Sequence, residues 1–284
     1  MELQDLLLRY LRTYGLITLR YVIFAGVLYL LFYVWKRRDW FRFKIQQKFP
    51  KDKDIWREIG YSLLSMSIFA AVGLGIHLLQ RAGYTQIYRD FSEHSFAYFA
   101  FTVVAFIVGH DAYFYWTHRL MHHKKLYPYV HLIHHKSHNP TPWAAFAFHP
   151  LEAVVEVGIV PIMVFLMPIH PLTILVWVLY MTSMNVLGHL GFELFPDGFA
   201  SGKVTKWHNT STHHNMHHKY VNCNYGLYFN IWDKLMGTNH AKYHSTFEEV
   251  AGRKKEAKEK SQETMLDSAF GSNLGNETET AAQI

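Results

Sequence analysis

Four long apolar stretches decide which folds are open to this chain. They cover residues 14–35, 59–80, 95–116 and 157–188. An α-helix needs about 20 apolar residues to cross the hydrocarbon core of a bilayer, so each of the first three stretches predicts one membrane-spanning helix. The fourth contains the tetrapeptide PIHP, whose prolines interrupt a helix, and it predicts a hairpin whose short first limb could be a re-entrant loop. The predicted fold is an all-α integral membrane bundle of about four to five spans.

Composition agrees with a membrane location and narrows the chemistry. Half of the 284 residues are hydrophobic and 18% are charged, which is typical of a membrane protein. The net charge of +6 is modest and local, so it does not indicate nucleic-acid binding. Cys223 is the single cysteine, which excludes a disulfide framework and a cysteine-based metal site. Any metal would therefore need nitrogen or oxygen ligands.

The distribution of positive charge predicts the orientation in the membrane. Residues 36–57 hold nine Lys and Arg against three Asp, and such an excess marks a cytoplasmic loop. With that loop inside, the two histidine-rich segments, which follow the third span and the hairpin, emerge on the cytoplasmic side. The sequence thus predicts a cytoplasmic, histidine-rich helical cap, in either an endoplasmic reticulum membrane or a bacterial inner membrane.

Domain boundaries follow from the same patterns. Residues 1–250 contain all the apolar stretches and histidine-rich segments and are expected to form a single membrane-embedded domain. Residues 251–284 are rich in charged and small polar residues, a composition that predicts a disordered tail.

The histidines are strongly clustered. Of twenty, nine lie in residues 110–149 and six in residues 189–218. Residues three or four apart share one face of a helix, so each local set could direct two or three imidazoles at a common point. Eight to nine such nitrogens exceed what one tetrahedral ion requires and predict two neighbouring metal ions. The candidate ligands, in which His123 and His213 are alternatives to their neighbours, are His118, His122, His123, His131, His134, His135, His189, His213, His214, His217 and His218.

Further polar residues near these histidines are candidates for hydrogen-bonding the ligands from behind. Metal-bound imidazoles usually donate their other N–H to a carboxylate or a similar acceptor. The candidates for this supporting role are His110, Asp111, His149, Glu152, Glu193 and Asp233. Imidazole suits iron, copper, zinc and nickel alike, so the ligands alone do not name the metal.

Several motifs in residues 95–240 together resemble the fatty acid hydroxylase superfamily, and within it the sterol desaturase branch. They are HDAYFYWTHRLMHH, HLIHH, HPLE, NVLGH, HHNMHH and NYGLYFNIWDKLMGT. The resemblance implies a membrane non-haem di-iron oxygenase, in which zinc can replace iron in a purified sample. It would use dioxygen and two electrons to hydroxylate or desaturate a lipid. The three histidine boxes and the additional histidine of the family fall on the candidate ligands named above.

The resemblance favours a sterol or sterol-like substrate, while fatty acyl, sphingoid, ether-lipid and carotenoid substrates stay open. The substrate is expected to enter from the bilayer past Trp143, Phe146 and Phe148. The chain carries no haem, flavin or nicotinamide signature, so a separate donor is expected, cytochrome b5-like or ferredoxin-like with its reductase.

Two other classes of function are less favoured. A zinc-dependent membrane hydrolase would need a metal-bound water and a nearby glutamate as base, but no HExxH helix is present. A metal transporter would place its ligands along the middle of its spans, whereas these histidines cluster at or beyond the span ends.

Overall fold

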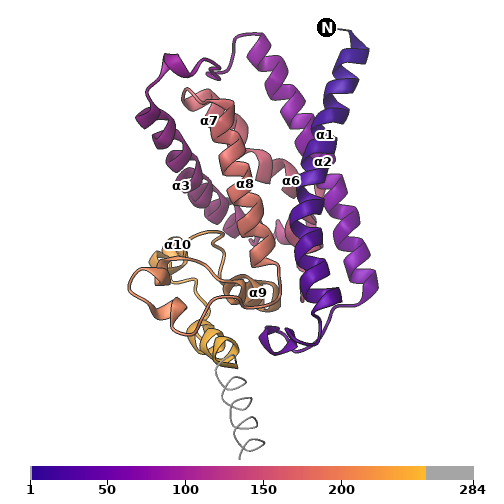
Figure 1. Cartoon of the computed structure of the whole chain (residues 1–284), viewed down its shortest axis with the longest axis vertical. Coiled ribbons are helices and arrows are strands. Elements are labelled where there is room, and N and C mark those ends of the chain that lie inside the picture. Colours follow the sequence, from indigo (N-terminus) through magenta and orange to yellow (C-terminus); the bar gives the residue numbers. More distant parts are fainter. Residues whose placement is uncertain (1, 254–284) are drawn as a thin grey trace, which may run out of the picture.

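The structure is a computed structural model that describes residues 2–253. Within these residues all regular secondary structure is helical, and β-pairing is confined to isolated bridges. Four helices are long and apolar enough to cross a membrane, which confirms the predicted all-α membrane bundle (Figure 1). These helices are α1 (Leu3–Tyr29) with its π-helical continuation η1 (Leu30–Trp35), α2 (Asp52–Arg81), α3 (Phe96–Met121) and α8 (Pro171–Gly188).

Shorter helices connect and cap the long ones. The α-helical members are α4 (Tyr127–Val130), α5 (Leu132–His135), α6 (Pro150–Val157), α7 (Ile159–Leu166), α9 (Ser211–Tyr220) and α10 (Ile231–Leu235). The 3₁₀ turns are η2 (Phe41–Phe43), η3 (Phe91–Glu93), η4 (Pro142–Phe146), η5 (Phe199–Ser201) and η6 (Thr205–Trp207).

The first three long helices extend beyond their predicted apolar stretches. Hydropathy marks only the part of a helix that suits the bilayer, whereas a helix continues as long as its polar turns are satisfied. Tyr10 on the early part of α1 contacts Ser67 of α2 through their hydroxyl oxygens at 2.7 Å. Asp52 and Asp54 lie in the first turn of α2, where acidic side chains stabilise the helix by interacting with its dipole. At the end of α3 the extension carries His118 on the helix itself.

The fourth apolar stretch forms a hairpin with an interrupted first limb. α6 and α7 lead away from the histidine end, and the backbone N–H of Gln86, between α2 and α3, donates to Val164 at 2.9 Å. After PIHP, α8 returns (Figure 1). The break between α6 and α7 falls at Gly158, where an added Cβ would lie 2.6 Å from the Tyr113 hydroxyl. The stretch therefore folds as a hairpin whose first limb consists of two short helices, and within it only α8 is long and apolar enough to cross a membrane.

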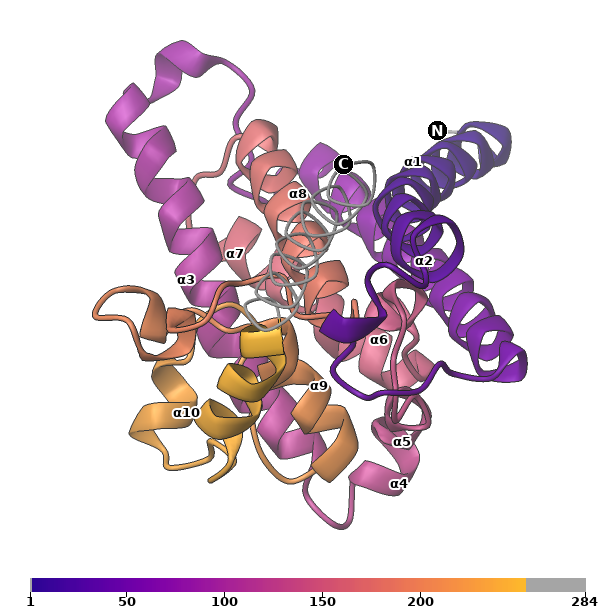
Figure 2. The same ribbon diagram turned by 60° about the horizontal axis from the view of Figure 1, so that its bottom comes forward.

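α9 and α10 gather with α4 and α5 at the end of the bundle where α3 and α8 finish (Figure 2). Both histidine-rich segments thus lie at the same end of the molecule, as expected from the count of spans. That this end faces the cytoplasm stays a prediction. Of the predicted tail, Ala251 is buried in a cluster with Met216 and Phe247, and residues 254–284 lie outside the described part of the chain.

Candidate metal centre

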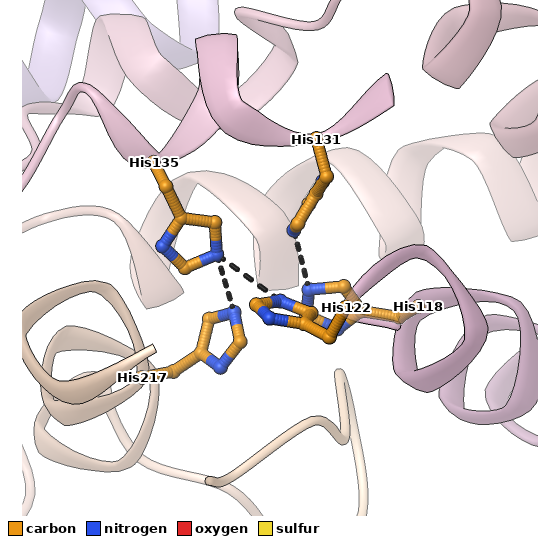
Figure 3. Close-up of side chains that lie close together, drawn as sticks. All are labelled: His118, His122, His131, His135 and His217. Atoms are coloured by element: carbon orange, nitrogen blue, oxygen red, sulfur yellow. Dashed lines mark hydrogen bonds between the residues drawn. The ribbon is translucent and has the colours of Figure 1, made fainter. Parts of the chain in front are cut away.

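Five histidines meet at one point beneath the ends of α3 and α9. Figure 3 shows their rings converging from three parts of the chain. The Nε2 atoms of His118 and His131 are 2.9 Å apart, and the Nε2 atom of His135 lies 3.2 Å from that of His122 and 3.0 Å from that of His217. We call this set the five-histidine group: His118, His122, His131, His135 and His217.

Four further histidines form a second group beside the first. The Nε2 atom of His189, at the end of α8, lies 3.0 Å from that of His214, 3.1 Å from that of His218 and 3.3 Å from that of His134. The rings of His134 and His135 belong to different groups although the residues are adjacent in sequence. We call this set the four-histidine group: His134, His189, His214 and His218.

The division between the groups follows helical spacing in part. Pairs four residues apart stay together, as His118 and His122 do in the first group and His214 and His218 do in the second. Histidines one or three residues apart can point to different groups, because each residue turns the helix by about 100°. His134 and His217 therefore leave their own boxes and join the opposite groups. The expectation that each box points at a single ion holds only for the first box.

Distances between the nitrogens fit metal coordination. Two nitrogens bound to one ion at about 2.1 Å lie about 3.0 Å apart when they subtend a right angle at the ion. The closest Nε2 pairs in the two groups span 2.9–3.3 Å. All nine donor atoms are nitrogen, and all nine side chains are buried.

The second ring nitrogen of several ligands has a defined partner. The Nδ1–H of His118 donates to the carbonyl oxygen of Tyr225 at 2.8 Å, and that of His217 donates to Cys223 at 2.6 Å. In the four-histidine group the Nδ1–H of His189 donates to Asn185 at 2.8 Å. A carbonyl oxygen can only accept, so these three neutral imidazoles carry their proton on Nδ1 and a lone pair on Nε2.

The pairing of His118 with His131 indicates a cation. The Nδ1 atom of His131 lies 2.7 Å from Oε1 of Glu152, and when it donates to the ionised carboxylate its Nε2 atom carries a lone pair. The facing Nε2 atom of His118 carries a lone pair as well. Two lone pairs 2.9 Å apart repel each other unless a positive ion lies close to both. The donor set therefore fits a bound metal ion.

Burial keeps the imidazoles in the form that binds metal. It lowers the pKa of each histidine of the two groups that lies outside the membrane spans, and neighbouring histidines lower most of these pKa values further by repelling an added proton. Neutral imidazole is the form that donates its lone pair to a metal. The histidines with lowered pKa are His122, His131, His134, His135, His189, His214, His217 and His218.

A strained turn after α9 supplies two of the carbonyl acceptors. Val221 and Asn224 both have positive φ, 68° and 56°, a region that residues other than glycine rarely adopt. The Asn224 side chain is buried, donates to the carbonyl of His213 at 2.9 Å and accepts from the N–H of His240 at 2.7 Å. These bonds hold the turn in the conformation that directs the Cys223 and Tyr225 carbonyls at His217 and His118.

Two buried aspartates hold the segment that follows this turn. Asp233 accepts from the backbone N–H groups of Tyr225 and Gly226 at 2.9 and 2.7 Å. Asp111 on α3 accepts from Tyr228 and its neighbour at 2.9 and 3.1 Å. Both carboxylates support the nine histidines of the two groups through the backbone.

Among the other residues proposed to support the ligands, none contacts either group directly. His110 pairs with the Tyr228 hydroxyl at 2.7 Å. His149 caps α6, where its Nδ1 atom accepts from Leu151 at 3.3 Å. Glu193 accepts from the N–H of Thr212 at 2.9 Å and so holds the start of α9. Glu152 alone in the predicted supporting set touches a histidine of the groups.

Two candidate ligands lie outside both groups. His123 is exposed, and its Nδ1 atom accepts from the N–H of Lys125 at 3.4 Å. His213 is buried, but its Nε2 atom lies 3.1 Å from the side-chain oxygen of Asn239 and 3.5 Å from Asp233. The structure thus brings His122 and His214, rather than their neighbours, to the centre. Sequence reasoning missed the carbonyls of residues 185, 223 and 225, since a backbone acceptor leaves no signal in residue type.

An apolar cavity adjoins both groups. Its volume is about 250 Å³, and it lies between α1, α2, α3, α6, α7 and α8. Phe148, on its wall, packs against the ring of His134 at 5.2 Å, and Phe114 packs against His118 at 4.9 Å between ring centroids. Phe146 also lines this cavity, whereas Trp143 lines a separate groove between α1 and α2.

Comparison with known proteins agrees with this geometry. A sequence model of the fatty acid hydroxylase family matches residues 103–238, the segment that contains both histidine groups. The chain belongs to the fatty acid hydroxylase superfamily.

Its curated relatives place this superfamily member in the sterol desaturase branch. It is 32% identical over 221 residues to a Delta(7)-sterol 5(6)-desaturase of Gibberella zeae, a match that covers 78% of this chain and 65% of the relative. It is 34% identical over 203 residues to an enzyme of the same name from Aspergillus fumigatus, covering 65% and 62%. It is 30% identical over 186 residues to the lathosterol oxidase of Homo sapiens, covering 64% and 60%. The matches span 60–65% of the length of these three relatives. No solved structure matches this superfamily member.

Proposed function

We propose that the chain is a membrane sterol desaturase, an oxidoreductase that introduces a carbon–carbon double bond into a sterol. The observation that carries this proposal is the apolar cavity, which lies among membrane helices and ends against both histidine groups. The names of the matched relatives supply the bond type. In such a reaction dioxygen, two electrons and two protons remove two hydrogen atoms from adjacent carbons, and the oxygen leaves as two water molecules.

Two iron ions, one in each histidine group, are proposed as the cofactor, and zinc would fit the same nitrogens. Iron supplies the oxidising power that an unactivated C–H bond requires, which acid–base side chains lack. The residues of this chain provide neutral imidazoles and hold them from behind. Glu152 and the carbonyls of Cys223 and Tyr225 fix three ring orientations in the five-histidine group.

The cavity walls position the substrate and exclude water. Phe114 and Phe148 separate the lumen from the imidazole rings that they pack against, so a substrate carbon beside these rings would lie close to both ions. The surrounding helices are apolar on their lipid-facing sides, and the substrate would enter from the bilayer. Side chains of the cavity rather than of the centre would set which carbons are presented.

Electrons would come from a separate cytochrome b5-like or ferredoxin-like carrier with its reductase. The carrier would dock at the end of the molecule where the two groups lie, which we propose faces the cytoplasm from an endoplasmic reticulum membrane. The positive-inside distribution of charge in residues 36–57 supports this orientation. Residues 1–250 would form a single enzyme domain.

The test uses cells that lack their own sterol desaturase, are supplied with lathosterol and are grown under oxygen-18 gas. We expect the wild-type chain to give a sterol with one additional double bond and no added label. His135→Ala in the five-histidine group and His134→Ala in the four-histidine group should each abolish the product. Mass spectrometry of extracted lipids gives the readout.

Other outcomes have clear meanings. A labelled alcohol would identify a hydroxylase, and an unchanged sterol pool, with the protein present and a reductase system supplied, would contradict the proposal. The exposed residue His123 provides a matched control, since His123→Ala should retain the product. Elemental analysis of the purified chain should find two metal ions per molecule, and fewer in His135→Ala and in His134→Ala.

A further inference from the structure

Two ionisable side chains line the apolar cavity without partners. Arg20 reaches it from α1 and Glu156 from α6. Neither makes a hydrogen bond or an ion pair with any residue in the described range 2–253, and the Nε atom of Arg20 is buried without an acceptor. A charged group at membrane depth is costly and usually marks a functional position. The chemistry proposed for the histidine groups uses neither residue.

Two other polar side chains of the cavity, those of His110 and Asn185, are already engaged. The Nδ1 atom of His110 pairs with the Tyr228 hydroxyl, and the side-chain amide of Asn185 donates to Ala145 at 2.6 Å. Arg20 and Glu156, one basic and one acidic, are therefore the ionisable side chains of the cavity that are free to bind a ligand.

Glu156 lies close to the histidine groups along its own helix. It follows Glu152 by four residues, so the two carboxyl groups share a face of α6 and are separated by about one turn, roughly 5.4 Å. Glu152 contacts His131 of the five-histidine group at 2.7 Å. The Tyr113 hydroxyl donates to the carbonyl of Val155 at 2.7 Å and fixes this part of the helix against α3. α1, which carries Arg20, contributes no histidine to either group.

We propose that Glu156 is the residue that hydrogen-bonds the hydroxyl group of a lipid alcohol bound in this cavity. The inference rests on the proposed function and adds a specificity determinant to it. A sterol carries its hydroxyl on the first ring, and the 5(6) bond named in the relatives begins at an atom that this ring shares with the second. A hydroxyl held one helical turn from Glu152 therefore places that bond beside the histidine groups.

A basic and an acidic side chain in one cavity would favour an uncharged head group. A fatty acid carboxylate would be attracted by Arg20 but repelled by an ionised Glu156, and a sphingoid amine would experience the reverse. A hydroxyl group meets neither repulsion and can donate to the ionised carboxylate or accept from the protonated one. Charge-assisted hydrogen bonds in a desolvated site are stronger than those between neutral groups.

The test measures binding without turnover. The full chain, loaded with redox-inactive zinc in nanodiscs, is titrated with tritium-labelled lathosterol, and unlabelled lathosterol, its 3-deoxy analogue and its 3-sulfate serve as competitors. We expect the wild-type chain to bind the 3-deoxy analogue at least about tenfold more weakly than lathosterol. Glu156→Leu should remove this preference and improve binding of the 3-sulfate, while Glu156→Gln, which keeps a hydrogen-bonding group, should retain part of the preference.

Two further variants make the result specific. Arg20→Leu should keep the preference for the hydroxyl. If Arg20→Leu lost this preference and Glu156→Leu kept it, the hydroxyl would bind to Arg20 on α1, and the proposal would be overturned. Val160→Ala removes an apolar part of the wall and should weaken all three ligands alike. Equal binding of lathosterol and the 3-deoxy analogue by the wild-type chain would also overturn it.

Failure of the proposed function is distinguishable. If wild-type cells form no desaturated sterol, the enzyme assignment fails whatever Glu156 does. If they form it and Glu156→Leu keeps the wild-type preference for lathosterol over the 3-deoxy analogue, only the present inference fails. The metal content of each variant, compared with wild type, shows whether the neighbouring histidine groups remain assembled.

Discussion

Glu152 combines burial with a direct bond to a histidine of the centre. Its side chain is 1% exposed, and Oε1 lies 2.7 Å from Nδ1 of His131. A carboxylate in this position fixes the ring and increases the basicity of the coordinating nitrogen, an effect worth about 10–100-fold in metal affinity. We predict that Glu152→Ala weakens metal binding by the five-histidine group within this range.

Cobalt titration of the metal-free full chain measures this effect, because absorbance reports each occupied site. Glu152→Gln should lose less than Glu152→Ala. Glu249→Gln, which changes a side chain on the surface of the molecule, should titrate as wild type does. Two sites of unchanged affinity in Glu152→Ala would show that His131 does not depend on this carboxylate.

Lys44 is a buried cation near the end of α1. It is fully buried, and its Nζ atom lies 3.3 Å from Oδ1 of Asn139 and 3.4 Å from the carbonyl oxygen of Gly191, which accepts from it. Burial lowers its pKa from 10.5 to about 7. Between these two values the unfolded chain binds more protons than the folded chain, so this residue makes the free energy of unfolding increase with pH.

We predict that the difference in melting temperature between wild type and Lys44→Met changes with pH in one direction. Wild type should gain stability relative to Lys44→Met as pH rises from about 7 to 10, by at most about 1.4 kcal/mol per pH unit. Thermal unfolding in detergent at several pH values is the measurement. A difference that is constant over this range would mean that Lys44 keeps its proton in the folded protein.

The turn after α9 couples backbone strain to two ligands. Asn224 adopts a left-handed conformation with its side chain bonded on both sides. Asn224→Gly should keep the conformation and lose the side-chain bonds, whereas Asn224→Ala should lose both. We predict that Asn224→Ala costs about 1–3 kcal/mol of stability and more than Asn224→Gly.

Melting temperatures and metal content of the two variants check this prediction. Both should lose metal more readily than wild type, because the carbonyls that orient His118 and His217 are then less well held. Asn222→Ala changes an exposed side chain of the same turn and serves as the control. If Asn224→Ala melted as wild type does, the turn would not depend on its asparagine.

At the level of elements, the sequence predicted where the long helices lie but not how all the histidines are divided between the two groups. Apolar stretches located the long helices, and PIHP located the turn of the hairpin. Helical spacing also identified pairs of histidines that lie in the same group, such as His118 with His122. It could not assign His134 and His217 to their groups, because α5 is a single turn whose direction depends on its tertiary contacts, and because the partners of α9 come from distant parts of the chain.

At the scale of the whole molecule, both histidine groups share one end of the bundle. This arrangement could be predicted from the number of membrane-spanning segments alone. The cavity could not be predicted, since Arg20, Glu156 and the other lining residues are brought together from six α-helices and the segments between them by packing that a single sequence does not specify. Ionisable residues inside apolar stretches were the available signal, and Arg20 is one of them.

Sidedness is testable with single cysteines in a Cys223→Ser background. Lys124→Cys lies between the first two histidine boxes, and Tyr84→Cys lies between α2 and α3 at the opposite end; both native side chains are exposed. If the histidine end faces the cytoplasm, a membrane-impermeant maleimide added to sealed microsomes, whose cytoplasmic face is outward, should label only Lys124→Cys. Labelling of only Tyr84→Cys would reverse the orientation.

Three of the nine histidines are oriented by peptide carbonyls, those of Asn185, Cys223 and Tyr225. Mutational drift can alter the side chains at such positions and leave the acceptor in place, since every amino acid brings the same carbonyl. An insertion or deletion of one residue there would misdirect the imidazole even if every histidine were retained. At these positions, a constant loop length therefore indicates retained function better than a constant residue type does.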